Sequence, residues 1–129
     1  MNSVRETFSK EERLCSVKTI EALFSGEGNI FYTPLFKVVW NLSDDNQQFP
    51  ARAAFSVSKR GFRLAVTRNL IKRRIREAYR KNKHLLYEHL SSKNIKISLF
   101  IILRSDKVPD YKTTEKSVKE AITNLIRLI

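Results

Sequence analysis

One short run of residues constrains the fold more than any other feature of this sequence. Residues 97–103 (Ile-Ser-Leu-Phe-Ile-Ile-Leu) are almost continuously apolar. Such a run is far too short for a transmembrane helix, which needs about 20 apolar residues, and it suits a β-strand that is covered on both faces. We therefore expect a buried strand with other elements packed over it.

Two further segments have the pattern of strands. Residues 36–42 and 51–58 alternate between side chains that point to an apolar face and side chains that point away from it. The link between them, residues 43–50, is short and polar, so the pattern predicts an antiparallel hairpin. A further short strand is expected near residues 29–34.

The first predicted helix covers roughly residues 16–25. Apolar residues recur there at helical spacing, with Ser16 as a candidate N-cap, until Gly26 and Gly28 end the helix. Ahead of it, Ser9-Lys10-Glu11-Glu12 has the form of a capping box.

Two more helices complete the pattern. Residues 67–86 are predicted as a helix with Thr67 as its N-cap, and residues 118–129 follow the spacing of an amphipathic helix. The order α-β-β-α-β-α predicts an α+β fold with helices packed on a mixed sheet. We expect one domain over residues 1–129, in which residues 1–15 form an extended N-terminal segment.

The positive charge of the chain is concentrated in one segment. The net charge is +12, and residues 59–83 hold eleven Lys and Arg side chains against one acid, Glu77, a net of +10. The other 104 residues carry 14 basic and 12 acidic side chains, a net of +2. An excess this large predicts a polyanionic partner, either a nucleic acid or an anionic membrane surface.

Projection of residues 68–86 at about 100° per residue separates two faces of the second helix. One face is apolar and is expected to pack on the sheet: Ile71, Ile75, Ala78, Tyr79, Leu85 and Leu86. A neighbouring arc is basic: Arg68, Asn69, Lys72, Arg73, Arg76, Arg80 and Lys83. Like charges four residues apart weaken an isolated helix by about 0.2–0.5 kcal/mol per pair, so we interpret the arc as a binding face.

The chemistry of the basic arc favours RNA among the polyanions. Arginine outnumbers lysine in it, and the planar guanidinium binds phosphate oxygens in pairs. A membrane-surface helix would need exposed Trp or Phe, whereas this one carries aliphatic residues and Tyr79. DNA stays an alternative by charge alone, but Asn69 is the only obvious base-reading side chain. Binding by backbone shape, as with folded RNA, is the leading interpretation.

Two stretches resemble the protein subunit of bacterial ribonuclease P. They are Ser56-Val57-Ser58-Lys59-Arg60 and Ala65-Val66-Thr67-Arg68-Asn69-Leu70-Ile71-Lys72-Arg73-Arg74-Ile75-Arg76-Glu77-Ala78-Tyr79. The family carries an Arg-Asn-Arg stretch, then Ile-Lys-Arg, then an Arg-(Glu or Gln)-Ala-aromatic run. The resemblance implies a sandwich with a left-handed β-α-β crossover, similar to the second domain of ribosomal protein S5.

The resemblance also implies a function. The protein would bind the catalytic RNA of ribonuclease P and hold the 5′ leader of precursor tRNA in a cleft, so that the complex removes the leader. Hydrolysis would be carried out by the RNA with Mg²⁺, which makes this chain an accessory subunit of an endoribonuclease without catalytic side chains of its own.

Carried over by position, the resemblance implies two sets of site residues. The contact with the catalytic RNA would comprise Lys59, Arg60, Arg68, Asn69, Lys72, Arg73, Arg76 and Arg80. The leader cleft would comprise Ile20, Phe24, Phe36 and Trp40, where aromatic rings offer stacking surfaces for single-stranded bases. For Phe36 and Trp40, an ordinary core role on an alternating strand is the competing interpretation.

Three positions depart from the family pattern. Leu70 stands where the family has its second arginine, and the projection places Leu70 on the far side from the basic arc. Ile20 occupies a position usually held by phenylalanine. The segment from Lys59 to Ala65 is one residue longer than is common. Because Leu70 stands in place of an arginine, we expect one RNA contact to be missing.

Other functions find less support in the sequence. No Cys cluster, Gly-rich phosphate loop or HExxH motif is present, so we predict no metal site in the protein and no obligate protein partner. The single Cys15 suits a reducing cytoplasm, and the N-terminus lacks a signal-peptide pattern. The alternatives are a non-catalytic ribosomal or RNA-assembly protein and, as a third class, a DNA-binding regulator.

Overall fold

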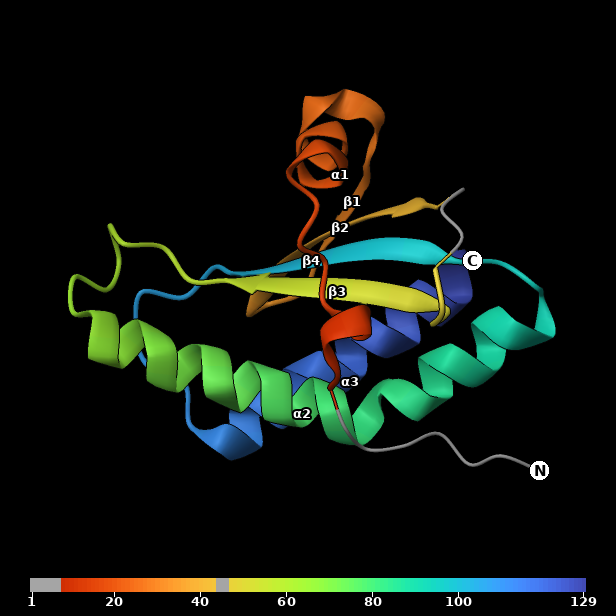
Figure 1. Cartoon of the computed structure of the whole chain (residues 1–129). Helices are drawn as coiled ribbons and strands as arrows, with labels where there is room; N and C mark the ends of the chain where they lie inside the picture. The colour runs from red at the N-terminus through yellow and green to blue at the C-terminus, as the bar shows by residue number, and fades with distance from the viewer. Residues whose placement is uncertain (1–7, 44–46) are drawn as a thin grey trace.

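The computed structural model describes residues 8–43 and 47–129. A four-stranded sheet lies at its centre, with two long helices on one face and a short helix on the other (Figure 1). The strands are β1 (Asn29–Tyr32), β2 (Phe36–Leu42), β3 (Ala51–Ser56) and β4 (Ile97–Leu103). The helices are α1 (Val17–Ala22), α2 (Ala65–Ser92) and α3 (Tyr111–Leu128), with a 3₁₀ turn η1 (Lys10–Glu12) and a π-helical turn η2 (Leu23–Glu27). The predicted α+β class and mixed sheet are confirmed.

The strand order corrects one prediction. The order across the sheet is β1-β2-β4-β3, so β4 lies between β2 and β3 and the predicted hairpin of those two strands is wrong. β4 is antiparallel to β2 and parallel to β3. Its side chains Ile97, Leu99 and Ile101 are fully buried. A strand this apolar is stabilised by a central position, because an edge position would leave one side of its backbone unpaired.

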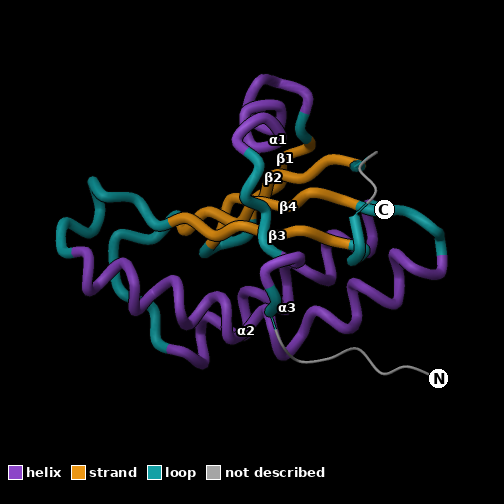
Figure 2. Tube along the Cα trace, in the orientation of Figure 1, coloured by secondary structure: helices purple, strands orange, loops and turns teal. Residues whose placement is uncertain are grey.

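Helix α2 connects the parallel neighbours β3 and β4 (Figure 2). The chain leaves β3, runs the length of α2 across one face of the sheet, and returns to form β4. Helix α3 packs beside α2 on the same face. The handedness of this crossover, which the family resemblance predicts to be left-handed, stays a prediction.

The two faces of the sheet have separate cores. Between the sheet and helices α2 and α3 lies the main core, which includes Phe36, Val38, Trp40, Leu99, Ile101, Ile71, Ile75, Ile122 and Leu125. On the α1 face a smaller cluster forms from Leu14, Leu23 and Val39, with Ile20, Ala54, Phe100 and Ile102 packed against it. Alternation along β2 and β4 explains the division, because successive strand residues point to opposite faces.

Helix α1 begins and ends as its sequence predicts. The Ser16 side chain accepts a hydrogen bond from the Thr19 amide at 3.3 Å, which satisfies one free N–H of the first turn. The following π-helical turn contains Gly26 at φ 97°, a backbone conformation that favours glycine. A Cβ atom at Gly28 would lie 2.5 Å from the Leu23 carbonyl oxygen, so this close approach also requires glycine.

Helix α2 is longer than predicted at both ends. It starts at Ala65, with Leu64 as an N-cap that makes no side-chain hydrogen bond, so the prediction of Thr67 as the cap is wrong. It continues to Ser92 because buried Leu86, Tyr87 and Leu90 extend the apolar face. Leu85, predicted to share that face, is 48% exposed.

Candidate RNA interface

Five cations on α2 and the loop before it have no acidic partner among the side chains that the structure describes. Arg73 and Arg76 are exposed on α2, Lys72 is half-buried beside them, and Lys59 and Arg60 are exposed in the preceding loop. Within residues 8–43 and 47–129, no carboxylate oxygen lies within 4.0 Å of these five side chains. Asn69 is exposed on the same helix. These six predicted contact residues therefore form one accessible basic surface, which we call the α2 surface.

Arg68 and Arg80, also predicted as contacts, have partners inside the protein. The Arg68 guanidinium donates to the carbonyl oxygens of Phe62 and Arg63 at 2.8 and 2.9 Å, which holds the loop before α2 against the helix. The Arg80 guanidinium forms an ion pair with Glu77 at 2.5 Å. Both side chains would have to share or exchange partners in order to bind phosphate.

Lys83 does not belong to the basic face. Its side chain is 1% exposed and forms an ion pair with Glu12, which is also 1% exposed. The projection of α2 placed Lys83 on the basic arc, and that prediction is wrong. The arc extends to the side of α2 that the N-terminal segment covers, so the basic surface ends before residue 83.

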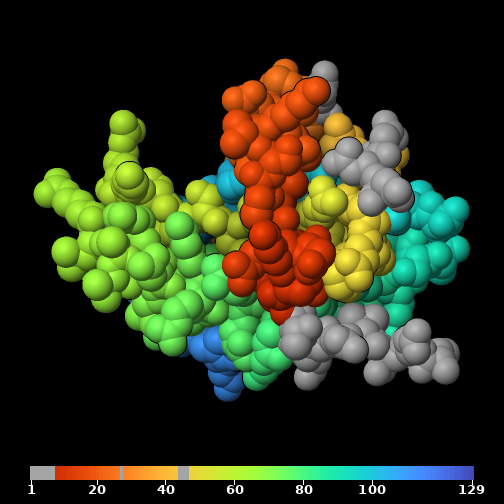
Figure 3. Space-filling view, in the orientation of Figure 1, coloured from red at the N-terminus to blue at the C-terminus, as the bar shows by residue number. Residues whose placement is uncertain are grey.

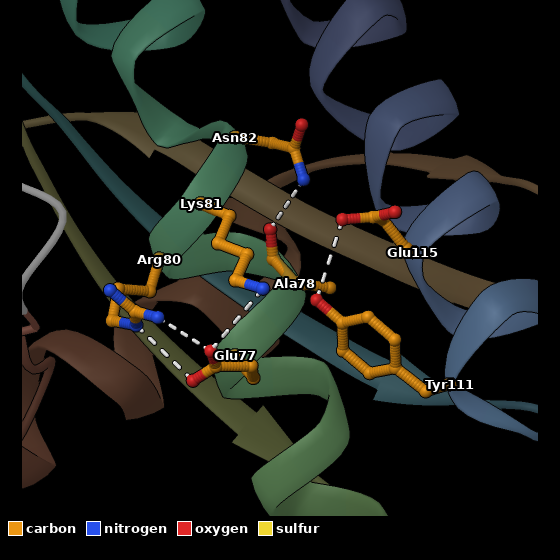
Figure 4. A network of polar contacts seen from close by, with 7 residues as sticks. All are labelled: Glu77, Ala78, Arg80, Lys81, Asn82, Tyr111 and Glu115. Atoms are coloured by element: carbon orange, nitrogen blue, oxygen red, sulfur yellow. Dashed lines mark hydrogen bonds and ion pairs between the residues drawn. The ribbon is translucent and has the colours of Figure 1, made fainter.

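The single acid of the basic segment, Glu77, neutralises the end of that surface (Figure 4). Its carboxylate lies between Arg80 and Lys81, whose Nζ is 3.8 Å away. The hydrogen bond from Arg80 lowers the pKa of Glu77, against a smaller opposing effect of burial. Tyr111 and Glu115 of α3 approach from the neighbouring helix, and the Lys81 Nζ lies 5.7 Å from the centre of the Tyr111 ring.

Leu70 lies beside the arginines of the α2 surface. It is 38% exposed and lines a hollow of about 490 Å³ together with Arg73, Arg74 and Arg76. The expectation that Leu70 points away from the arginines is therefore wrong. Arg74 also donates to the Pro109 carbonyl oxygen at 2.7 Å. Phe8, Glu77, Arg80 and Tyr111 also line this hollow, so it combines apolar, basic and acidic side chains.

A second accessible surface lies on the opposite face of the sheet. Phe24, in the turn η2 that follows α1, is 47% exposed and stacks edge-on against Phe100 of β4, with ring centres 5.2 Å apart. Ile20 of α1 and Ile102 of β4 pack at the same place. We call the surface formed by Phe24, Ile20 and the β4 side chains the α1 cleft, after the predicted leader cleft to which Ile20 and Phe24 were assigned.

Phe36 and Trp40 do not reach the α1 cleft. They point into the main core beneath α2 and α3, where their side chains are 0% and 8% exposed. The prediction that they line one cleft with Ile20 and Phe24 is therefore wrong. The face of β2 toward α1 carries Val39 instead, because Val39 alternates with both flanking core residues.

The sequence matches the family model of Ribonuclease P over residues 8–126. The chain belongs to the ribonuclease P protein family. It is 37% identical over 117 residues to the ribonuclease P protein component of Porphyromonas gingivalis, covering 91% of this chain and 85% of that protein.

Solved structures of family members share the fold. The RNase P protein from Thermotoga maritima matches with a TM-score of 0.67 and 22% identity, covering 92% of this chain and 97% of that chain. The Staphylococcus aureus RNase P protein matches with a TM-score of 0.63 and 21% identity, covering 88% and 94%. Membership of the family makes this chain a component of an endoribonuclease complex that processes tRNA, with ribonuclease P RNA as its partner.

Phe100 and Ile102 are the cleft residues that the sequence did not single out. Their strand is apolar on both faces, so its alternation is hidden and no pattern distinguishes core residues from cleft residues. In the structure, register supplies the distinction: Phe100 pairs with Val39 on β2 and with Ala54 on β3, which share its face. Strand pairing was therefore the missing information.

The described part of this family member offers no obvious ligands for a metal ion. In residues 8–43 and 47–129, no three His, Cys, Asp or Glu side chains are grouped so that they could hold one. In the same residues, no helix is long and apolar enough to cross a membrane.

Proposed function

We propose that this chain binds two RNAs at once. The α2 surface would dock on the catalytic RNA of ribonuclease P, and the α1 cleft would hold the 5′ leader of precursor tRNA. The catalytic RNA would carry out the Mg²⁺-dependent hydrolysis that removes the leader. The protein would contribute binding and orientation.

The observation that supports the first contact is the group of five cations without acidic partners on the α2 surface. Guanidinium groups on one turn after another can follow a row of phosphates, and their release of bound counterions favours association. Arg68 and Arg80 would have to give up internal hydrogen bonds or an ion pair before they could bind phosphate. The main contacts would therefore be Lys59, Arg60, Lys72, Arg73 and Arg76.

The support for the second contact is an exposed aromatic ring beside a half-buried one. Phe24 presents nearly half of its surface to solvent, although its edge-on contact with Phe100 holds the ring in place. A fixed and exposed ring offers a stacking surface for an unpaired base, worth about 1–3 kcal/mol per base. Duplex RNA keeps its bases stacked inside, so a single-stranded leader fits this surface better.

Reconstitution tests the proposed function. The purified chain is mixed with a bacterial ribonuclease P RNA, and cleavage of a precursor tRNA is followed at low Mg²⁺ concentration. We expect cleavage at the mature 5′ end by the mixture and little cleavage by either component alone. If the protein binds the RNA but never stimulates cleavage, the function would instead be that of a non-catalytic RNA-binding protein.

The location of the complex in the cytoplasm stays a prediction, as does its Mg²⁺ requirement. Titration of Mg²⁺ in the same cleavage assay measures the Mg²⁺ requirement directly. We expect the protein to lower the Mg²⁺ concentration at half-maximal cleavage, because its cations neutralise phosphates that would otherwise repel each other. An unchanged midpoint would contradict this role.

A further inference from the structure

Residues 8–15, which we call the strap, connect the two faces of the sheet. Phe8 packs on Phe55 and Tyr79 of the main core, with ring centres 5.6 and 5.8 Å apart. At the other end, Leu14 lies in the small core under α1, and its amide donates to the Ala53 carbonyl oxygen at 2.9 Å. In Figure 3 the strap and α1 form one continuous column that starts on α2, crosses the edge of β3 and rises above the sheet. The strap therefore connects α1 to α2, and its N-terminal part packs on α2.

One buried ion pair fixes the contact between the strap and α2. Glu12 and Lys83 are each 1% exposed and pair with each other, and the Tyr87 hydroxyl donates to Glu12 at 2.6 Å. The Ser9 amide and hydroxyl also donate to the Glu12 carboxylate, both at 3.2 Å, so the predicted capping box forms. Glu12 is thus bound from α2 and from the strap itself. We call Glu12, Lys83 and Tyr87 the clamp.

The clamp is better suited to fixing the position of the strap on α2 than to raising the free energy of unfolding. A buried ion pair adds little stability over well-packed apolar side chains, because both charges lose their hydration. Removal of one partner is nevertheless costly, since it leaves a buried charge uncompensated. Glu12 therefore has one favourable position, opposite Lys83, and any slip of the strap along α2 separates the charges.

The position of the clamp connects the two proposed RNA contacts. Lys83 belongs to the same helix as the α2 surface, and the strap leads from Glu12 directly to Ser16, the N-cap of α1. Phe24 follows at the other end of α1 and touches Phe100. A displacement of the strap would therefore move Phe24 relative to β4 and change how the Phe24 and Phe100 rings are exposed to solvent.

We propose that Glu12 and Lys83 are positioning residues, which hold α1 in the place on the sheet where Phe24 and Phe100 can both contact a leader nucleotide. This inference rests on the proposed function of the α1 cleft. Lys83 would then support leader binding indirectly, by holding α1 in position. It would not contact phosphate, unlike the cations of the α2 surface.

The test compares leader dependence in Glu12→Gln and in the wild type. Gln keeps the size of the side chain and removes the charge that pairs with Lys83, so the strap is expected to loosen. Each protein is assembled with a bacterial ribonuclease P RNA, and kcat/KM is measured for precursor tRNA with leaders of about ten and about two nucleotides. We define the leader advantage as the ratio of the two values. It should fall about fivefold or more in Glu12→Gln, the factor equivalent to one stacked base.

Three controls separate positioning from a loss of stability. Affinity for the catalytic RNA should stay within about twofold of wild type in Glu12→Gln, because the α2 surface is intact. Ile122→Ala, a cavity in the main core on α3, should lower thermal stability without lowering the leader advantage. Glu12→Gln combined with Lys83→Met removes both charges and should restore most of the leader advantage.

Hydrogen exchange supplies a readout that does not depend on activity. The Leu14 amide, which donates to Ala53, should exchange faster in Glu12→Gln if the clamp holds the strap. Should Glu12→Gln fail to fold, Tyr87→Phe removes one hydrogen bond to Glu12 and keeps the ring, and a smaller loss of leader advantage is expected. An unchanged leader advantage in the folded clamp variants would overturn the inference and leave the proposed function standing. A wild-type protein without any leader advantage would overturn both.

Discussion

The salt dependence of RNA binding distinguishes two cations that the sequence places on the same helical arc. Arg76 is exposed on the α2 surface, whereas Lys83 is buried against Glu12. Each phosphate contact contributes about 0.7–0.9 to the slope of log affinity against log salt. Five free cations on the α2 surface therefore predict a wild-type slope of roughly −3.5 to −4.5.

Arg76→Met should make that slope shallower by about 0.7–0.9, because one contact is lost. Lys83→Met should leave the slope unchanged, although it removes the same unit of charge. The assay is filter binding or fluorescence anisotropy with labelled catalytic RNA over a series of salt concentrations, at a temperature where circular dichroism shows both variants folded. Equal changes of slope in the two variants would refute the reasoning, since net charge alone would then govern binding.

Four further outcomes follow from the environments of single residues. Trp40→Ala should lower the free energy of unfolding by about 3–5 kcal/mol in urea denaturation, as expected for a buried aromatic side chain. Phe24→Ala should be milder in the same experiment and should weaken binding of a leader-bearing precursor by about 1–3 kcal/mol, and a larger effect on folding than on binding would mark Phe24 as core. Glu77→Gln should steepen the salt slope by about 0.7–0.9, because it removes the negative charge beside Arg80 and Lys81; an unchanged slope would show that this end of α2 does not contact the RNA. Burial raises the pKa of Glu12, but the hydrogen bonds from Lys83, Tyr87 and Ser9 outweigh this effect, so the net pKa lies below 4.5. The ionised carboxylate therefore stabilises the folded state above about pH 4.5, and this contribution is lost as the pH falls through the lowered pKa. In urea denaturation at acid pH, Glu12→Gln should not show this loss.

Local patterns in the sequence predicted the elements of the fold well. The bounds of β2 and β4 agree with the alternating segment 36–42 and the apolar segment 97–103. The caps and glycines around α1 act as expected, because each depends on residues within one or two helical turns. The apolar face of α2 was also predictable over residues 71–79, since helical periodicity determines it.

The arrangement of those elements was harder to predict because it depends on contacts between distant residues. The polar link at 43–50 fits a hairpin, yet the central position of β4 is set by its burial on both faces. The aromatic side chains of β2 were assigned to the wrong face of the sheet for the same reason: alternation shows which residues share a face but not which helix covers it. The inward turn of Lys83 depends on Glu12, 71 residues away in the sequence.

Crosslinking from two positions tests the central claim, that the α2 surface and the α1 cleft bind different RNAs. A photoreactive amino acid replaces Arg73 in one variant and Phe100 in another, and each is assembled with catalytic RNA and a leader-bearing precursor tRNA. We predict that position 73 crosslinks to the catalytic RNA and position 100 to the leader. Crosslinks from both positions to the same RNA, or from position 100 to the catalytic RNA alone, would contradict the account.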